Sequence, residues 1–289
     1  MKKIFLMMFL VAFTLSAGAQ NRTRRQQQQQ QEQEQQDQKQ TLQQQVPPVQ
    51  APPQAERQVN PKRMVPGMME VWDPEVEIIK PGVTNSEAPS DAIILFDGTD
   101  INKEWEDTHG NPTKWIVSDS AMISVKGAGY IKTKRKFSNI QLHIEWKTPS
   151  EVTGESQGRG NSGVFLQGLY EVQILDSYNN KTYRHGQAGA IYKQYPPLVN
   201  ASRGPGEWQT YDIIYTAPVF NKDSISYFIP PRITVIHNGV LVQNNVCIMG
   251  PTDYVNIPQA NIKYHGPESI ELQDHGNPVA FRNIWVREL

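Results

Sequence analysis

Hydrophobic and polar residues alternate strictly in Ile140–Lys147, which is the clearest strand pattern in the chain. Every second residue from Ile140 to Trp146 is apolar, while His143 and Glu145 occupy positions between them. A period of two places one set of side chains in a core and the other set against water or a ligand. The same kind of pattern predicts further strands at Gly163–Gln167, Tyr170–Leu175, Trp208–Tyr215, Arg232–His237, Val240–Asn244, Ser269–Gln273 and Ala280–Arg287.

Asn238-Gly239 separates two of these strands and favours a tight hairpin, because both residues tolerate a positive φ. No segment of residues 91–289 shows a convincing apolar period of 3.6. We therefore expect this region to form one all-β domain, an antiparallel sandwich of two sheets. Polar side chains on its inner strands, such as those of His143, Glu145, Glu171 and Gln173, could line a groove for a saccharide.

Residues 1–20 have the order of a secretory signal peptide. Lys2 and Lys3 precede the apolar run Ile4–Leu15, and Ala17-Gly18-Ala19 fits a small-residue cleavage site. The alternative is an uncleaved anchor, but the run is short for a stable membrane span. We expect a bacterial protein that is secreted across the inner membrane and acts in the periplasm or at the cell surface.

Residues 21–60 are rich in Gln and then in Pro, and they offer almost nothing to bury. Such a segment cannot offset the entropy of ordering, so we predict a disordered linker. A coiled coil is the alternative, but apolar heptad positions are missing. Residues 61–90 are predicted to be a tether, in which Trp72, Val76, Ile78 and Ile79 pack against the domain.

The chain has 28 Lys and Arg residues against 29 Asp and Glu residues, which argues against a nucleic-acid partner. Its single cysteine excludes an intramolecular disulfide and every metal site that needs several cysteines. No cofactor is certain from the sequence. A divalent metal ion would need His and carboxylate ligands gathered from distant segments.

The first candidate for chemistry is the segment Tyr170–Asp176, which carries Glu171, Gln173 and Asp176. Positions five apart face opposite sides of a regular strand, but a bulge after Gln173 would bring Asp176 to the side of Glu171. Two carboxylates on one side would suit acid–base or nucleophilic work on a glycosidic bond. The spacing resembles the E-x-D-x-x-E strand of laminarinase-type glucanases, with departures at Gln173 and Asp176. The alternative is a half-buried polar strand edge.

The second candidate is Glu145, a general base if burial raises its pKa, or else a member of a cross-strand ion pair. His185 and His275 lie beside glycines in predicted loops, where a histidine can carry protons or bind metal. Trp208 and Tyr192 could stack on sugar rings, while Arg282 and Lys193 could hold hydroxyls or a carboxylate. Strand alternation places Trp146 and Trp285 in the core, on the side opposite to Arg282.

Several segments together resemble the 3-keto-disaccharide hydrolase domain family over about residues 91–289. The resemblance rests on Leu95–Thr99 followed by Trp105, on Glu145–Lys147, Asn161–Val164, Tyr170–Asp176, Gly189–Tyr192, Pro196-Pro197, Gly206–Trp208, His237–Gly239, Glu271–Gly276 and Phe281–Ile284. It implies a concanavalin A-like jelly-roll sandwich, in agreement with the strand pattern. It also implies an exported enzyme that cleaves glycosides whose C3 carbon is a ketone.

A C3 ketone acidifies the C2 hydrogen, so a general base can remove that proton before the C1 substituent leaves and water adds. Glu145 or Glu171 is the expected base, and Asp176 or His275 is the expected acid near C1. Arg282, Gln173 and His185 would bind the ketone or the hydroxyls, and a cation could stabilise the enolate instead. The alternatives in other classes are a non-catalytic carbohydrate-binding module and a surface-tethered interaction protein.

Overall fold

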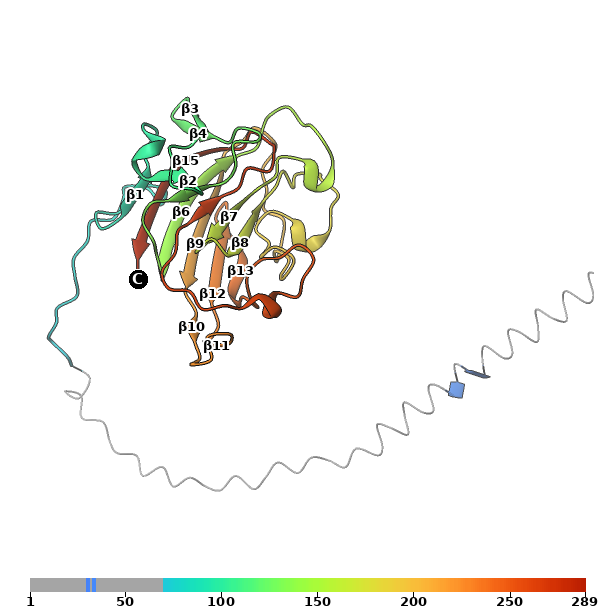
Figure 1. The fold of residues 1–289 in the computed structure, drawn as a ribbon. Coiled ribbons are helices and arrows are strands. Elements are labelled where there is room, and N and C mark those ends of the chain that lie inside the picture. The colour runs from blue at the N-terminus through green and yellow to red at the C-terminus, as the bar shows by residue number, and fades with distance from the viewer. Residues whose placement is uncertain (1–29, 32, 35–69) are drawn as a thin grey trace, which may run out of the picture. The chain divides into compact units, whose positions relative to one another are not determined.

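The computed structural model describes residues 30–31, 33–34 and 70–289, so the predicted signal peptide and most of the predicted linker lie outside the described residues. Contacts divide the chain into two units, Met1–Glu75 and Val76–Leu289. The second unit carries every strand that the structure describes (Figure 1). No helix in the described ranges is both long enough and apolar enough to cross a bilayer.

The larger sheet has eight strands, and every pairing in it is antiparallel. Its path runs β13 (Val240–Cys247), β12 (Arg232–His237), β9 (Gln209–Thr216), β6 (Ile140–Lys147), β15 (Ala280–Glu288), β4 (Ala121–Ile123) and β3 (Ile116–Ser118), and β1 (Ile93–Phe96) also pairs with β15. The predicted Asn238-Gly239 turn joins β12 to β13, with φ of 51° and 80° at the two residues.

The second sheet has five antiparallel strands. Its order is β2 (Trp105–Asp107), β5 (Ile131–Thr133), β14 (Glu271–Leu272), β7 (Ser162–Leu166) and β8 (Tyr170–Ile174). A small hairpin of β10 (Val219–Phe220) and β11 (Tyr227–Ile229) extends from one end of the domain (Figure 1). Within residues 70–289, four short 3-10 helices occur in loops: η2 (Ile101–Lys103), η3 (Ser156–Gly158), η4 (Arg184–Gly186) and η5 (Pro258–Asn261).

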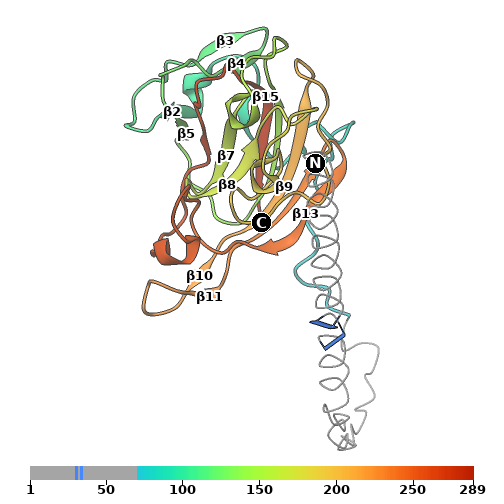
Figure 2. The same ribbon diagram turned by 90° about the vertical axis from the view of Figure 1, so that its right-hand side faces the viewer.

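One apolar core fills the space between the two sheets, which Figure 2 shows as two layers. Leu142, Ile144 and Trp146 of β6 face Val164 of β7 and Val172 of β8, and all five are fully buried. Tyr211 of β9 also reaches across the layers, where its hydroxyl donates to the Gln173 carbonyl at 2.7 Å. The predicted all-β, two-sheet antiparallel sandwich is confirmed.

Alternation along the strands decides which polar residues point outward from each sheet. In β6 the residues between the core positions are His143 and Glu145, and in β8 they are Glu171 and Gln173. Because β6 and β8 belong to different sheets, these two polar sets lie on opposite outer faces of the sandwich. The expectation that they share one groove is therefore wrong.

A bulge in β15 overturns a second expectation about side-chain direction. Pairing with β6 shifts register between Arg282 and Trp285, and Asn283 adopts a φ of 46° there. The extra residue puts Arg282 and Trp285 on the same outer face. Trp285 stacks on His143 and donates its indole N–H to the Ser86 carbonyl at 3.0 Å, so it is covered without belonging to the central core.

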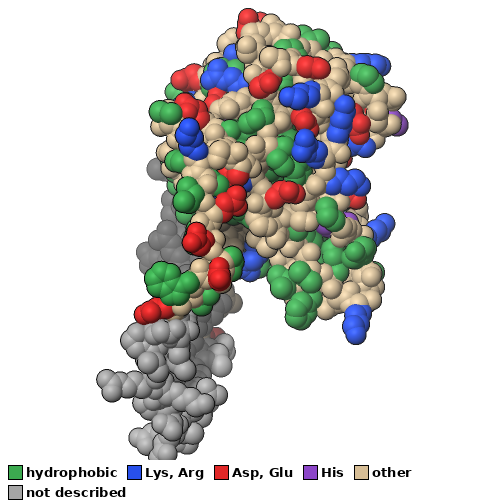
Figure 3. All heavy atoms as spheres, turned by 90° about the vertical axis from the view of Figure 1, so that its left-hand side faces the viewer, with side chains coloured by type: hydrophobic (Ala, Val, Ile, Leu, Met, Phe, Trp, Pro, Cys, Tyr) green, Lys and Arg blue, Asp and Glu red, His purple; other side chains and the backbone are tan. Residues whose placement is uncertain are grey.

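The segment before the domain is attached through polar groups and not through the apolar residues that the sequence suggested. Trp72, Val76 and Ile78 are 83%, 91% and 97% exposed, and only Ile79 of the four predicted residues is half-buried. The Ser86 carbonyl instead accepts hydrogen bonds from Asn283 and Trp285 of β15. On the face shown in Figure 3, acidic and basic side chains are interspersed, in keeping with a net charge of −1.

Candidate active site

A cavity of about 340 Å³ opens on the outer face of the five-stranded sheet, over β7 and β8. Glu171 and Gln173 of β8 line it together with Phe165 of β7. Loops that follow or flank the strands supply the other lining residues, which are Tyr130, Asn161, Tyr192, Thr252, Asp253, Tyr254, Gln273 and His275. Among the residues predicted from the sequence, this cavity gathers Glu171, Gln173, Tyr192 and His275.

Glu171 is the buried acid of this cavity, with only 4% of its surface exposed. Its backbone is fixed on both sides: its N–H donates to Thr252 Oγ1 at 2.9 Å, and its carbonyl accepts from Tyr192 N–H at 3.2 Å. Burial raises the pKa of its carboxyl group to about 8, because water no longer stabilises the charged form. A carboxyl group with a pKa near neutrality is suited to general acid–base catalysis.

Gly163 of β7 leaves the space that the Glu171 side chain occupies. A Cβ atom at this position would lie 2.5 Å from Glu171 Oε1 and 3.0 Å from Phe165 Cε2, closer than side chains pack. The glycine is needed here for close approach and not for a left-handed backbone, since its φ is not positive. The sequence Asn161-Ser162-Gly163 therefore shapes the floor of the cavity.

Side-chain amides surround the carboxyl group. Gln173 Nε2 lies 3.0 Å from Gln157 Oε1, and with its amide turned over Gln173 donates to Glu171 Oε1 at 3.0 Å. Gln273 Nε2 donates to the Tyr130 hydroxyl at 2.6 Å. These groups can donate to or accept from the oxygens of a sugar without adding a net charge beside Glu171.

Aromatic rings form two walls of the cavity. Tyr130 and Phe165 lie with their centroids 5.7 Å apart on one side. Tyr192 and Tyr254 also line it, and the ammonium group of Lys193 lies 4.6 Å from the ring centre of Tyr254. Lys193 is thus held near the rim by cation–π contacts, in a left-handed backbone conformation with a φ of 63°.

A divalent metal remains a prediction. Glu171, Asp253 and His275 line the same cavity, but within residues 70–289 no three or more His, Cys, Asp or Glu side chains are grouped to hold an ion. The Asp253 carboxylate already accepts hydrogen bonds from Asn256 and Asn261. The described side chains of this cavity offer no ready-made set of metal ligands, so the chemistry below uses only the chain's own side chains.

Glu145 lies on the other outer face, and both of its carboxylate oxygens accept hydrogen bonds. Its Oε2 accepts from Arg282 Nε at 2.7 Å, and its Oε1 accepts from Asn283 Nδ2 at 2.9 Å. Burial alone would raise its pKa, but the nearby His143 imidazole and the hydrogen bonds from Asn283 and Arg282 outweigh that effect and hold the pKa at about 2. A carboxylate of such low basicity is poorly suited to remove a proton from carbon.

His143 belongs to the same network as Glu145. Burial alone would lower the pKa of its imidazole, but the hydrogen bond to Asp212, at 2.7 Å, and the ion pair with Glu145, at 3.8 Å, raise it to about 9. The network is therefore a set of mutually neutralising charges. It corresponds to the cross-strand ion pair that was the alternative interpretation for Glu145.

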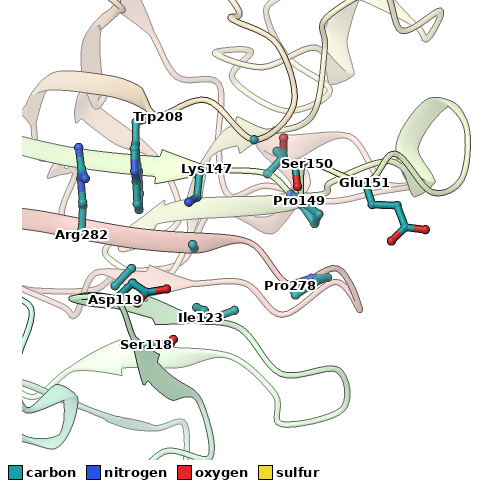
Figure 4. Close-up of a pocket in the computed structure, with 14 residues that line it drawn as sticks. Ser118, Asp119, Ile123, Lys147, Pro149, Ser150, Glu151, Trp208, Pro278 and Arg282 are labelled. Atoms are coloured by element: carbon teal, nitrogen blue, oxygen red, sulfur yellow. The ribbon is translucent and has the colours of Figure 1, made fainter.

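Trp208, predicted to stack on sugar, has a cation against each side of its ring, as Figure 4 shows. Lys147 Nζ lies 4.7 Å and Arg282 Cζ 4.0 Å from the ring centre. Neither Trp208 nor Arg282 lines the cavity around Glu171. Both instead line a second cavity, on the outer face of the eight-stranded sheet.

Asp176 and His185 also lie apart from the lining of the Glu171 cavity. Strand β8 ends at Ile174, and Asp176 forms a buried ion pair with Arg159 at 2.7 Å. His185 is an exposed residue of η4, and its carbonyl accepts from Lys193 N–H at 2.9 Å. The proposed bulge after Gln173 is therefore not what orients Asp176.

Reasoning from the sequence missed seven lining residues, which are Tyr130, Asn161, Phe165, Thr252, Asp253, Tyr254 and Gln273. Alternation could have placed Phe165 on the outward side of β7 and Gln273, which directly follows β14, on the outward side of the predicted strand Ser269–Gln273. Tyr254 and Thr252 come from a loop whose approach to β8 depends on tertiary packing. No local sequence pattern predicts that Thr252 and Tyr254 line the cavity.

Residues 91–287 match the 3-keto-alpha-glucoside-1,2-lyase-like domain. The chain belongs to this family. A 3-keto-disaccharide hydrolase of Bacteroides thetaiotaomicron is 26% identical over 237 residues, which cover 68% of this chain and 78% of that relative. The family resemblance expected from the sequence motifs is thereby confirmed.

Two solved structures from Parabacteroides distasonis, both of proposed glycosyl hydrolases, are similar to this chain. One is 51% identical with a TM-score of 0.74, and the match covers 78% of this chain and 97% of the other. The second is 19% identical with a TM-score of 0.50 over 69% of this chain and 94% of the other, and it bears on the fold alone. The comparisons support a carbohydrate-active hydrolase.

Proposed function

We propose that the cavity around Glu171 cleaves the glycosidic bond of 3-keto-glycosides, with Glu171 as the general base. The observation that carries this proposal is a carboxyl group that is buried, free of any ion pair in the described structure and raised in pKa to about 8, at the floor of a polar cavity. The family and the hydrolase relative in Bacteroides thetaiotaomicron support the choice of substrate class.

In the first step the Glu171 carboxylate takes the proton from C2, and the electron pair of the C–H bond moves into an enolate on the C3 oxygen. The amide of Gln173, beside Glu171, is suited to donate to that oxygen. The ionised fraction of Glu171 increases as the pH approaches its pKa, so we expect the rate to rise with pH toward about 8.

In the second step the C3 ketone re-forms, and the C2–C3 electron pair of the enolate becomes a C1–C2 double bond. The C1–oxygen bond breaks at the same time, and its electron pair leaves with the oxygen. The departing oxygen needs a proton, and His275 at the exposed edge of the cavity is the proposed donor, in place of the ion-paired Asp176. Water then adds its oxygen to C1 and a proton returns to C2, so the sum of the steps is hydrolysis. Tyr192 and Lys193 are proposed to contact the sugar at the rim.

Export remains part of the proposal. The signal-like residues 1–20 would direct the protein across the inner membrane, to the periplasm or to the cell surface. Detection of the chain in the periplasmic or surface fraction, starting after about residue 20, would support this location. Retention of the intact N-terminus in the cytoplasm would contradict it.

Hydrogen exchange at C2 tests the mechanism directly. The full chain is incubated with a 3-keto-glucoside in heavy water, with and without a chelator, and the released sugar is analysed for deuterium. We expect aglycone release together with deuterium at C2. Release without exchange would instead indicate direct displacement at C1, and binding without release would indicate a carbohydrate-binding module.

A further inference from the structure

The second cavity is the larger of the two, with a volume of about 540 Å³, and it lies on the outer face of the eight-stranded sheet. Its floor is made by small or apolar residues of neighbouring strands, Ala121 and Ile123 of β4 and Ala280 of β15. The volume lies within the range of ordinary ligand sites, roughly 300–1,000 Å³. The cavity is separate from the one around Glu171, because no residue lines both.

One wall of this cavity carries two cations held in place by Trp208. Figure 4 shows the indole between Arg282 and Lys147, and both distances to the ring centre are below 5 Å. Lys147 Nζ forms no hydrogen bond or ion pair with any residue that the structure describes. Arg282 uses its Nε for Glu145, which leaves its terminal nitrogens available on the cavity side. Because the indole restrains the Lys147 side chain, an anion that binds its ammonium group loses less side-chain entropy than it would at a freely mobile lysine.

The opposite rim offers acceptors. Ser118 at the end of β3 and Asp119 in the turn that follows line the cavity on this side, and Ser150 lies toward the far end (Figure 4). A carboxylate such as Asp119 accepts hydrogen bonds from sugar hydroxyls. Glu151 also lies at the end of the cavity away from Arg282 in that view.

We propose that this cavity is an accessory binding site for a uronic acid, a sugar that carries a carboxylate. The sugar carboxylate would bind Lys147, and the sugar hydroxyls would donate to Asp119 and the serines across the floor. Arg282 lies on the other face of the indole and holds the ring of Trp208 in place. The carboxylates at the rim disfavour a doubly charged phosphate, whereas a single carboxylate with several hydroxyls satisfies both walls. The proposal does not depend on the reaction assigned to the Glu171 cavity.

A pair of matched sugars tests the proposal on the full-length chain by NMR. The indole N–H signal of Trp208 is identified by its loss in Trp208→Phe, and methyl β-D-glucuronide and methyl β-D-glucoside are titrated at constant ionic strength. We expect the glucuronide to shift this signal with an affinity at least tenfold higher than that of the glucoside. We expect Lys147→Gln to weaken glucuronide binding about tenfold, since a hydrogen bond to a charged group is of that order.

Lys132→Gln is the matched control, because Lys132 lies in β5 of the other sheet and pairs with Glu106. It should leave the titration unchanged. Equal affinity for the two sugars, no binding of the glucuronide, or no effect of Lys147→Gln would overturn the proposal. Binding of inorganic sulfate with the same affinity as the glucuronide would also overturn the proposal, because the cavity would then bind any anion and not a uronic acid in particular. Glu171→Gln should keep glucuronide binding, so failure of the reaction and failure of this site remain distinguishable.

Discussion

Each outer face of the sandwich carries a glutamate from a strongly alternating strand, but the two glutamates lie in opposite electrostatic environments. Glu145 in β6 and Glu171 in β8 are both outward-facing carboxylates in strongly alternating strands, and both are nearly inaccessible to water. Glu145 is surrounded by cationic and amide donors, and its pKa falls to about 2. Glu171 has no ion-pair partner among the described residues, and burial raises its pKa to about 8.

The difference shows that burial alone does not decide what a carboxylate does. Burial raises the pKa of both groups, but only on the eight-stranded sheet do hydrogen bonds from charged partners outweigh it. The first environment stabilises a permanent charge and suits a structural ion network. The second keeps a proton available near neutral pH and suits catalysis.

The largest expected effect is that of Glu171→Gln on turnover. Loss of the general base should lower kcat on a 3-keto-glucoside by about 10²- to 10⁴-fold, because this is the usual contribution of proton transfer by a positioned side chain. The variant is measured next to Glu145→Gln, which should keep kcat within about threefold at temperatures where it is folded. Full activity of Glu171→Gln, or an equal loss of activity in Glu145→Gln, would contradict the claim that Glu171 and not Glu145 is the general base.

Gly163→Ala should have the next largest effect. The added methyl group would meet Glu171 Oε1 and must displace the carboxyl group. We expect kcat to fall about 10- to 100-fold, because small misplacement of a reacting group has costs of this size. Gly158→Ala is the matched control, since a Cβ there meets nothing within 4 Å and its φ is not positive. Equal activity of the two variants would contradict a positioning role for Gly163.

Glu145→Gln should act on stability. It removes the negative partner of Arg282 and of His143 in a network that is mostly buried. We expect the free energy of unfolding at pH 7 to fall by about 1–3 kcal/mol, the usual cost of leaving charged donors poorly paired. Denaturant titration measures this change, with Gln141→Ala on the same strand as the comparison at a less buried position. An unchanged midpoint would show that the network adds nothing to stability.

The sequence predicted the fold better than it predicted the site, and particular residues show why. Strand Ile140–Lys147 is found with the predicted bounds, because period-two alternation directly reports a half-buried strand. The three-residue strands β2, β3, β4 and β5 are too short to give such a pattern and were missed. Their formation depends on neighbouring strands that already offer backbone partners.

Site residues depend on which sheet each strand joins, and a single sequence does not specify strand order. The sequence correctly pointed to Glu171, Gln173, Tyr192 and His275 as outward or loop residues, and these four line one cavity. It grouped Glu145 and Arg282 with them, although β6 and β15 belong to the other sheet. A bulge at Asn283 then reversed the expected direction of Trp285, which strict alternation could not foresee.

The pH dependence of stability gives the smallest and most selective test of the comparison. The pKa of Glu171 in the folded protein lies above its ordinary value. Its contribution to the free energy of unfolding is therefore fully present below about pH 4.5 and is lost as the pH rises through about 8. The pKa of Glu145 in the folded protein lies below its ordinary value. Its contribution to the free energy of unfolding is therefore present above about pH 4.5 and is lost as the pH falls toward about 2.

The wild type should therefore lose stability relative to Glu171→Gln when the pH is raised from 5 to 9, by at most about 1.4 kcal/mol per pH unit. Relative to Glu145→Gln it should lose stability when the pH is lowered from 5 toward 2. Thermal unfolding of the three proteins across this range measures both differences. If both differences ran in the same direction with pH, the opposite environments of the two carboxylates would be refuted, because a shared direction requires shifts of the same sign.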